Sequence, residues 1–205
     1  MIELKNLSIG YDKNKPLKKD FTYTFEDNKI YGILGESGCG KSTLLKTIAG
    51  LVYPLSGEVY IDGKIIQRAD KNDAYMMHQN YTSFDWLNCL DNILITEKVK
   101  RNRITKDKKQ DALKWLEMVG LGKCVDKYPT QLSGGMKQRL ALARTLYAKP
   151  SIILMDEPLS ALDEETRTKM QDLIVNINKE THNTIIMITH SKEEAEKMCD
   201  EILRF

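Results

Sequence analysis

The chain has 205 residues, of which 41% are hydrophobic, and a formal net charge of +2. This length and apolar content favour one α/β domain, and the nearly neutral charge gives no reason to expect a nucleic-acid partner. No apolar run reaches the roughly 18 residues that a transmembrane helix needs, so the chain is not expected to span a membrane by itself. The 4 cysteines are scattered without a C-x-x-C pair, which suits the reducing cytosol.

The N-terminal part of the chain predicts an antiparallel β-layer that leads into a buried strand. Residues 2–9 and 21–25 alternate apolar and polar side chains, the pattern of half-buried strands. Residues 29–34 form a short apolar run typical of a buried strand. Residues 43–51 then predict a helix that ends near Gly50.

The middle of the chain changes from strands to helices. Glycines bound a predicted strand at 57–63, and a shorter strand is predicted at 74–78. From residue 80 to residue 149 the pattern is helical. Within that part, Asp107 and Gln110 fit an N-cap and its reciprocal partner, at the start of a helix that Gly120 ends.

The C-terminal part returns to buried strands separated by helices. Apolar runs at 151–156 and 184–189 predict parallel strands, and 201–205 predicts an edge strand. Between them, a helix with apolar residues at 170, 173, 174 and 177 and a short helix over 192–198 are expected.

One glycine-rich segment supplies the strongest chemical signal. Residues 35–43 fit the phosphate-binding pattern G-x-x-x-x-G-K-S/T, between a predicted strand and a predicted helix. Its backbone N–H groups and the helix N-terminus would hold phosphates, with Lys41 on the β- and γ-phosphates and Ser42 on Mg²⁺. The residues expected to contact a nucleoside triphosphate are Gly35, Ser37, Gly38, Cys39, Gly40, Lys41, Ser42 and Thr43.

A pair of carboxylates follows the predicted strand at 151–156. Ligands of parallel sheets bind at the carboxyl ends of the strands, so Asp156 and Glu157 are expected to face the phosphates. Asp156 suits a Mg²⁺ role, and Glu157 could polarise a water molecule for attack on the γ-phosphate.

These signals together predict a P-loop NTPase fold of the α/β class. It would have a parallel core sheet, an N-terminal antiparallel β-layer and an inserted helical subdomain. As one domain over 1–205, residues 1–79 and 150–205 would form the β-layer and the nucleotide-binding core, and residues 80–149 the helical subdomain.

A second glycine-rich segment, Leu-Ser-Gly-Gly-Met at 132–136, precedes another predicted helix. Ser133, Gly134 and Gly135 could form a second phosphate cradle at the start of that helix. A serine N-cap followed by flexible glycines would explain the same residues without a ligand.

The chain resembles the ATPase subunits of ABC transporters over nearly its whole length. The segment 132–136 matches their LSGGQ signature except at Met136, and Ser-Ala-Leu-Asp at 160–163 matches their D-loop. Gln79 follows a strand as their Q-loop glutamine does, and His190 occupies the place of their switch histidine. Tyr11 lies where an aromatic residue stacks on adenine in that family.

The resemblance implies a head-to-tail dimer, made of two identical or two similar subunits, that encloses ATP between them. Ser133 and Gly135 would reach the γ-phosphate of ATP bound by Lys41 and Ser42 of the second subunit. In each ATP site, His190 would hold the γ-phosphate and the attacking water near Glu157. Gln79 would contact Mg²⁺ and the water.

The resemblance also implies separate permease subunits that dock near residues 79–90, at the cytoplasmic face of a bacterial membrane. Phe84 and Trp86 could line that docking groove or could be buried core of the helical subdomain. The segment around Trp86 is similar to that of nitrate, sulfonate and taurine importers, although Phe84-Asp85 replaces their usual Leu-Pro. Because the sequence ends at Phe205, no C-terminal regulatory domain is expected.

Other functions remain open at this stage. One is an exporter ATPase, and another is a soluble ABC-type ATPase that remodels a different partner. The long coiled coils of repair members and the duplicated motifs of translation members are both missing from the sequence. A regulatory module that binds ATP without hydrolysing it is disfavoured by Lys41, Glu157 and His190.

Overall fold

The computed structural model describes residues 1–66, 74–78 and 83–205, which divide into two compact units. The first, here called the β unit, comprises residues 1–76, 150–157 and 174–205. The second, here called the helical unit, comprises residues 77–149 and 158–173. Within the described ranges, none of the helices combines the length and apolarity needed to cross a bilayer.

A sheet with a parallel core organises the β unit, as predicted. Its strand order is β6-β7-β8-β3-β9, with bounds β3 (Ile30–Leu34), β6 (Ala74–Met77), β7 (Ile152–Asp156), β8 (Thr184–Ile188) and β9 (Glu201–Arg204). Every residue of β7 and β8 is buried, which explains their unbroken apolar sequences. The register pairs Asp156 with Ile188, so β7 and β8 end at the same level.

The predicted N-terminal layer is a second, antiparallel sheet. Its order is β2-β1-β4-β5, with bounds β1 (Ile2–Ile9), β2 (Lys18–Phe25), β4 (Ser56–Ile61) and β5 (Lys64–Ile65). The register of β1 against β4 shifts between Lys5 and Ser8, where Asn6 has a positive φ of 48°. Such a bulge bends and twists the strand that carries it.

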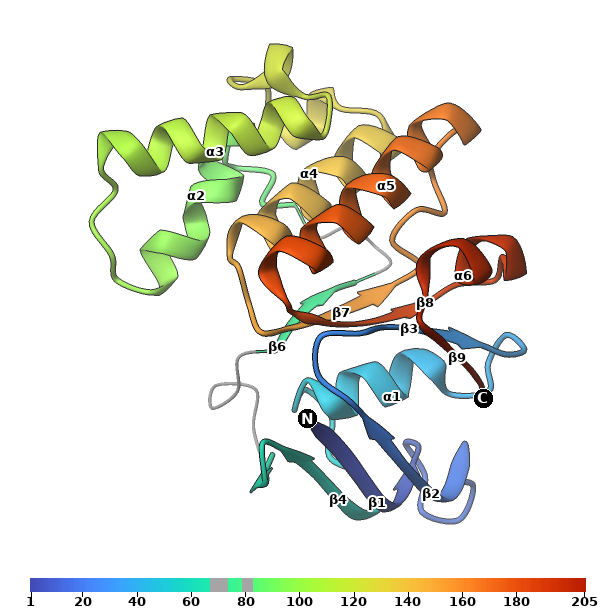
Figure 1. Ribbon diagram of the computed structural model, residues 1–205. Helices are drawn as coiled ribbons and strands as arrows, with labels where there is room; N and C mark the ends of the chain where they lie inside the picture. The colour runs from blue at the N-terminus through green and yellow to red at the C-terminus, as the bar shows by residue number, and fades with distance from the viewer. Residues whose placement is uncertain (67–73, 79–82) are drawn as a thin grey trace. The chain divides into compact units, whose positions relative to one another are not determined.

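Helix α1 (Lys41–Ile48) lies between the two sheets (Figure 1), and α6 (Lys192–Met198) packs on β3. The helix buries Leu44, Leu45 and Ile48 completely in the core that the sheets share. Phe25 of β2 meets Tyr31 of β3 edge to face, with ring centroids 4.9 Å apart. The first turn of α1 is thereby fixed at the end of β3, where the phosphate-binding pattern occurs.

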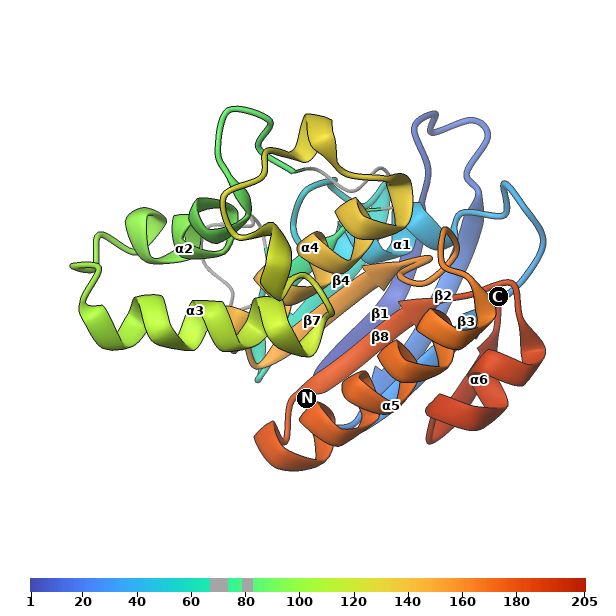
Figure 2. The same ribbon diagram turned by 90° about the horizontal axis from the view of Figure 1, so that it is seen from above.

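The helical unit contains α2 (Cys89–Val99), α3 (Lys106–Met118), α4 (Gly134–Tyr147) and the first part of α5 (Glu164–Thr181), with short 3₁₀ turns at Gly122–Cys124 and Pro129–Gln131. Helices α2 and α3 run side by side (Figure 2), and both contact α4. Their buried faces include Ile93, Leu116 and Leu140, each at most 1% exposed. Ala143 and Leu146 extend the buried face of α4.

The predicted cap of α3 is wrong. Thr105, not Asp107, is the N-cap, and its hydroxyl accepts a hydrogen bond from the backbone N–H of Lys108. Gln110 therefore lies inside the helix and is not the partner of a capping box. Asp107 remains in the first turn, where a carboxylate interacts favourably with the helix dipole.

The bulge between β1 and β4 yields a prediction about stability. A Cβ on Gly57, whose φ is +76°, would lie 2.3 Å from the carbonyl oxygen of Asn6. We expect Gly57→Ala to lower the free energy of unfolding by about 2–4 kcal/mol, because overpacking adds to the cost of the left-handed backbone. Equilibrium chemical denaturation measures this loss.

Gly63 is the matched control, since its φ is +73° and a Cβ there would meet nothing within 4 Å. Gly63→Ala should cost only the backbone term, about 1 kcal/mol. Equal losses in the two variants would show that the close approach of β4 to β1 contributes nothing.

Candidate functional site

The chain turns sharply between β3 and α1, over the predicted phosphate-binding loop. Gly38 and Gly40 have φ values of +83° and +106°, and Gly40 is the N-cap residue of α1. Successive residues in such a conformation point their N–H groups round one point, which forms a cradle for an anion. Ser37 is exposed, and Gly35 and Cys39 are half-buried, so the loop is open to a ligand.

Lys41 is buried inside this loop, with an exposed fraction of 6%. Its ammonium donates hydrogen bonds to the carbonyl oxygens of Gly35 (2.8 Å) and Glu36 (2.7 Å) and lies 4.0 Å from the sulfur of Cys39. These bonds hold the positive charge at the mouth of the cradle. Ser42 is half-buried in the first turn of α1, whereas Thr43 is buried in the β unit.

Two predicted catalytic residues meet at the carboxyl end of the parallel sheet. His190 Nε2 lies 2.8 Å from Glu157 Oε1, although the two residues are 33 positions apart in the chain. Glu157 has a positive φ of 51°, a strained conformation for a residue with a side chain, and its N–H donates to the carbonyl of Ile188. Strain held by surrounding structure is frequent at functional sites.

The turn after β8 holds His190 in place. The hydroxyl of Thr189 donates a short hydrogen bond to the buried carboxyl group of Glu194 and accepts one from the N–H of Ser191. Ser191 is in turn the N-cap of α6, since its hydroxyl accepts from the N–H of Glu194. The backbone on both sides of His190 is therefore fixed, while its ring is half-exposed.

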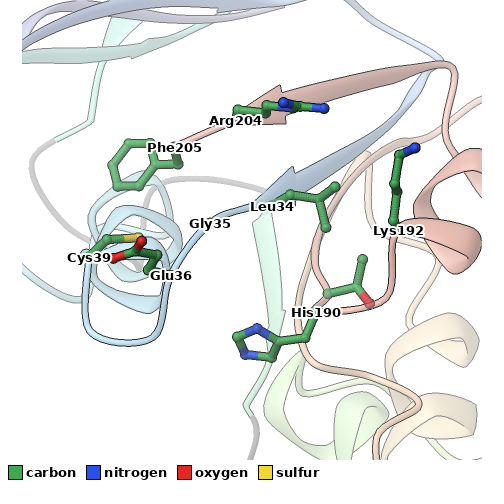
Figure 3. A pocket seen from close by; sticks show the side chains of 9 residues that line it. Leu34, Gly35, Glu36, Cys39, His190, Lys192, Arg204 and Phe205 are labelled. Carbon is green, nitrogen blue, oxygen red and sulfur yellow. The ribbon is translucent and has the colours of Figure 1, made fainter.

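A cavity of about 490 Å³ opens beside the phosphate-binding loop. Its lining residues lie at or just beyond the carboxyl ends of β3, β8 and β9 (Figure 3): Leu34, Gly35, Glu36, Cys39, Thr189, His190, Lys192, Arg204 and Phe205. All of them belong to the β unit. The His190 ring lies at the lower end of the cavity in Figure 3, and the loop that carries Glu36 and Cys39 forms one side of the cavity.

The oxygen donors at this end of the sheet fit a magnesium ion. Asp156 is the last residue of β7 and is 4% exposed, and Ser42 carries a hydroxyl in the first turn of α1. Mg²⁺ prefers such hard oxygen ligands and keeps several from water and phosphate. The described residues contain no cluster of three or more His, Cys, Asp or Glu side chains that could hold a metal unaided.

Tyr11 lies in the exposed turn that follows β1 and is 72% exposed. Leu17 closes that turn with a backbone hydrogen bond to Ile9. A Cβ on Gly40 would lie 3.0 Å from the Cβ of Leu17, so the turn packs on the end of the phosphate-binding loop. A ligand held in the loop could thus also contact this turn.

The second glycine-rich segment belongs to the helical unit and begins α4. Ser133 is the N-cap, and its hydroxyl accepts from the N–H of Met136 at 3.3 Å. The capping interpretation is therefore confirmed, which leaves the phosphate interpretation open because Ser133 and Gly134 remain exposed. A Cβ on Gly134 would meet nothing within 4 Å, so space adjoins the helix N-terminus.

Of the residues predicted near the permease, Gln79 lies outside the described residues. Trp86 is 73% exposed, so the buried-core interpretation is wrong for this side chain. Its ring lies 5.3 Å from that of half-buried Phe84, which in turn faces the guanidinium of Arg144 at 5.1 Å. The buried amide of Asn92 accepts from the N–H of Phe84 and donates to the carbonyls of Phe84, Leu87 and Asn88.

Sequence reasoning missed two side chains next to the predicted sites. Gln138 of α4 is 1% exposed and accepts a hydrogen bond from the N–H of Ala161. Arg167 of α5 donates to the carbonyl oxygens of Leu159 and Leu162. A polar residue on the buried face of α4 was a signal for the first, whereas periodicity contains none for the second.

Three comparisons relate the chain to known proteins. A family model described as "ABC transporter" matches residues 18–160. The taurine import ATP-binding protein of Roseobacter denitrificans is 41% identical over 199 residues, 95% of this chain and 73% of that protein. The nitrate import ATP-binding protein of Synechococcus elongatus is 39% identical over 186 residues, 90% of this chain and 68% of that protein.

Two solved structures share the whole fold. A dimeric bacterial ABC transporter cassette has a TM-score of 0.92 and 31% identity, over 100% of this chain and 94% of that one. A dimeric ATP-binding cassette in a post-hydrolysis state with ADP and phosphate has a TM-score of 0.91 and 30% identity, over the same shares of 100% and 94%. The predicted P-loop NTPase fold is confirmed.

Lys41 can be tested directly. We expect Lys41→Ala to weaken nucleotide binding by on the order of ten- to a hundredfold, because a hydrogen bond from a charged donor contributes about 1.5–3 kcal/mol. Calorimetric titration with ATP measures the change. Lys46→Ala, which removes a half-buried lysine from the same helix, is the control and should bind ATP normally. Unchanged affinity in Lys41→Ala would contradict the phosphate role.

Proposed function

We propose that this chain, which belongs to the ABC transporter family and is an ATP-hydrolysing subunit, powers solute import through separate permease subunits. The resemblance predicted from the sequence is confirmed at the level of the family. Import is supported by relatives named for taurine import and nitrate import. The observation that carries the hydrolytic role is the Glu157–His190 pair, held at 2.8 Å at the carboxyl end of the sheet.

The residues of the β unit divide the work of hydrolysis. Lys41 and the backbone of residues 35–43 would bind the phosphates, with Ser42 and Asp156 holding Mg²⁺, which neutralises phosphate charge when bound. The Glu157 carboxylate would orient and deprotonate the attacking water. His190 lies within hydrogen-bond reach of that carboxylate and would hold the γ-phosphate with its exposed ring. Gln79 of the helical unit, which lies outside the described residues, would contact the same ion and water, as the family resemblance implies.

A second ATP-binding subunit is required to complete the site. The exposed N-terminus of α4, with Ser133, Gly134 and Gly135, is a second anion cradle in the same chain. In the proposed head-to-tail dimer it covers the γ-phosphate of ATP bound by the other subunit. ATP then joins the subunits, and hydrolysis releases them. Tyr11 would stack on the adenine from its exposed turn.

The permease is proposed to dock on residues 79–90 of the helical unit, at the cytoplasmic face of a bacterial membrane. Trp86 presents an exposed aromatic surface there, and aromatic residues dominate the energetics of many interfaces. The four hydrogen bonds of Asn92 hold the backbone that carries this ring. A fixed anchor loses little conformational entropy on binding.

Glu157 is tested by Glu157→Gln, which keeps the shape of the side chain and removes the base. We expect the ATPase rate to fall on the order of 10²–10⁴-fold with ATP affinity retained, because general-base catalysis contributes that much. Phosphate release and ATP titration measure the two quantities. Glu193→Gln, an exposed change of the same kind on α6, should leave both unchanged. A normal rate in Glu157→Gln would reject the assigned base.

The transport role is tested by purifying tagged Glu157→Gln protein with Mg-ATP from detergent-solubilised native membranes. We expect a multi-span membrane protein to co-purify and Trp86→Asp to reduce its recovery severalfold. Val99→Asp is the matched control, since Val99 of the same unit is also 73% exposed. Recovery of soluble proteins alone would favour a remodelling ATPase, and a permease known to export would overturn the direction of transport.

A further inference from the structure

The segment 158–163, here called the tip loop, includes the residues 160–163 that match the D-loop. It connects the proposed catalytic carboxylate of Glu157 to α5 along the chain. It begins directly after Glu157 and belongs to the helical unit. The side chains of Leu159 and Leu162 are 2% and 5% exposed, whereas Ser160 and Ala161 between them are exposed. The tip loop is therefore anchored at two points and presents its centre at the surface.

Helix α4 holds the exposed centre of the tip loop from one side. The side-chain carbonyl of Gln138 accepts a hydrogen bond from the N–H of Ala161 at 3.1 Å. Gln138 lies one turn beyond the N-terminus of α4 and is 1% exposed, so its amide is fixed by the packing around it. The hydrogen bond therefore fixes the position of Ala161 relative to α4.

The backbones of the tip loop and of residues 133–135 also touch directly. A Cβ on Gly135 would lie 3.0 Å from the carbonyl oxygen of Ala161 and 3.2 Å from a methyl group of Leu162. A side chain at position 135 would require these neighbours to move by a few tenths of an ångström. Glycine thus allows the two segments to pack this closely, in addition to any role at a phosphate.

Helix α5 holds the tip loop from the other side. The guanidinium of Arg167 donates to the carbonyl oxygens of Leu162 (2.6 Å) and Leu159 (3.5 Å). The Asp163 carboxylate accepts from the N–H of Thr166 at 2.9 Å, which caps the helix start. The tip loop is therefore held by two side chains: Gln138 accepts from its N–H at Ala161, and Arg167 donates to its carbonyl oxygens.

We propose that Gln138 and Arg167 are positioning residues that join the tip loop and residues 133–135 into one rigid surface for the ATP-loaded second copy of this chain. The inference rests on the proposed dimer and adds residues that the dimer model does not require.

The test uses Gln138→Leu, which keeps the size of the buried side chain and removes the acceptor. We expect ATP affinity of the single chain to stay within about twofold, while turnover and ATP-dependent dimerisation in the Glu157→Gln background each fall on the order of tenfold. The Hill coefficient for ATP hydrolysis should fall towards one. Titration, sedimentation and steady-state kinetics measure these quantities.

Thr145→Val is the matched control. Thr145 is a buried residue of the same helix, and its hydroxyl donates within the helix to the carbonyl of Ala141. This variant weakens α4 without touching the tip loop, so we expect the normal Hill coefficient and dimerisation. An equal loss in Thr145→Val would overturn the inference, because general loosening of α4 would then explain the effect.

Arg167→Met tests the same surface from α5, at a half-buried position where folding is less at risk. Gln138→Leu and Arg167→Met should give the same phenotype, and the double variant should be no more than about twofold worse than either, because both act on one loop. Fully additive losses would overturn the inference. If the Glu157→Gln parent dimerises with ATP and adding Gln138→Leu does not change this dimerisation, only this inference is rejected. If the parent itself does not dimerise with ATP, the proposed dimer is rejected as well.

Discussion

The buried ammonium of Lys41 and the left-handed turn at Gly38 and Gly40 are mutually dependent, and the site is built on them. A buried charge is tolerated only with good hydrogen-bond partners, and here they are the carbonyls of Gly35 and Glu36 at the start of the same loop. The hydrogen bonds of Lys41 therefore join the two ends of the loop. The first turn of α1 can lie there only because both sheets pack on the apolar side of that helix. Phosphate binding at the loop is thus a consequence of how the core is assembled.

The register of the same sheet brings together Glu157 and His190, the pair proposed to act in hydrolysis. Asp156 of β7 pairs with Ile188 of β8, so the residues just beyond the two strands emerge at one level. Glu157 and His190 meet there, and the cost of a positive φ at Glu157 is offset by the packing of two wholly buried strands. A rigid sheet with short connections places two side chains from distant parts of the chain within 2.8 Å of each other. Rigid placement of this kind is what general-base catalysis requires.

Local sequence patterns predicted most of the strands and helices, and they predicted that the phosphate-binding loop lies between β3 and α1 of the β unit. The strands β7 and β8 were evident because unbroken apolar runs need burial on both faces, and the phosphate-binding loop because its spacing is tied to a strand and a helix. The cap of α3 was wrongly placed at Asp107, since Thr105 and Asp107 can both cap a helix and only packing selects between them. Exposure of Trp86 was undecidable, because an aromatic residue suits a core and an interface equally. Gln138 and Arg167 bind backbone groups of a distant loop, and no sequence period encodes such a contact.

The contacts of the helical unit give a structural role to the glycine at position 135 and the glutamine at position 138. In the proposed dimer the N-terminus of α4 is open to a phosphate, yet two glycines in its first turn weaken the helix there unless other contacts hold it. The tip loop supplies that support, because Ala161 packs on Gly135 and is bonded to Gln138. Arg167 in turn holds the tip loop, so a surface with exposed Ser133 and Ser160 is rigid before any partner binds. A preorganised surface loses little binding energy to ordering, which favours the proposed ATP-dependent dimer.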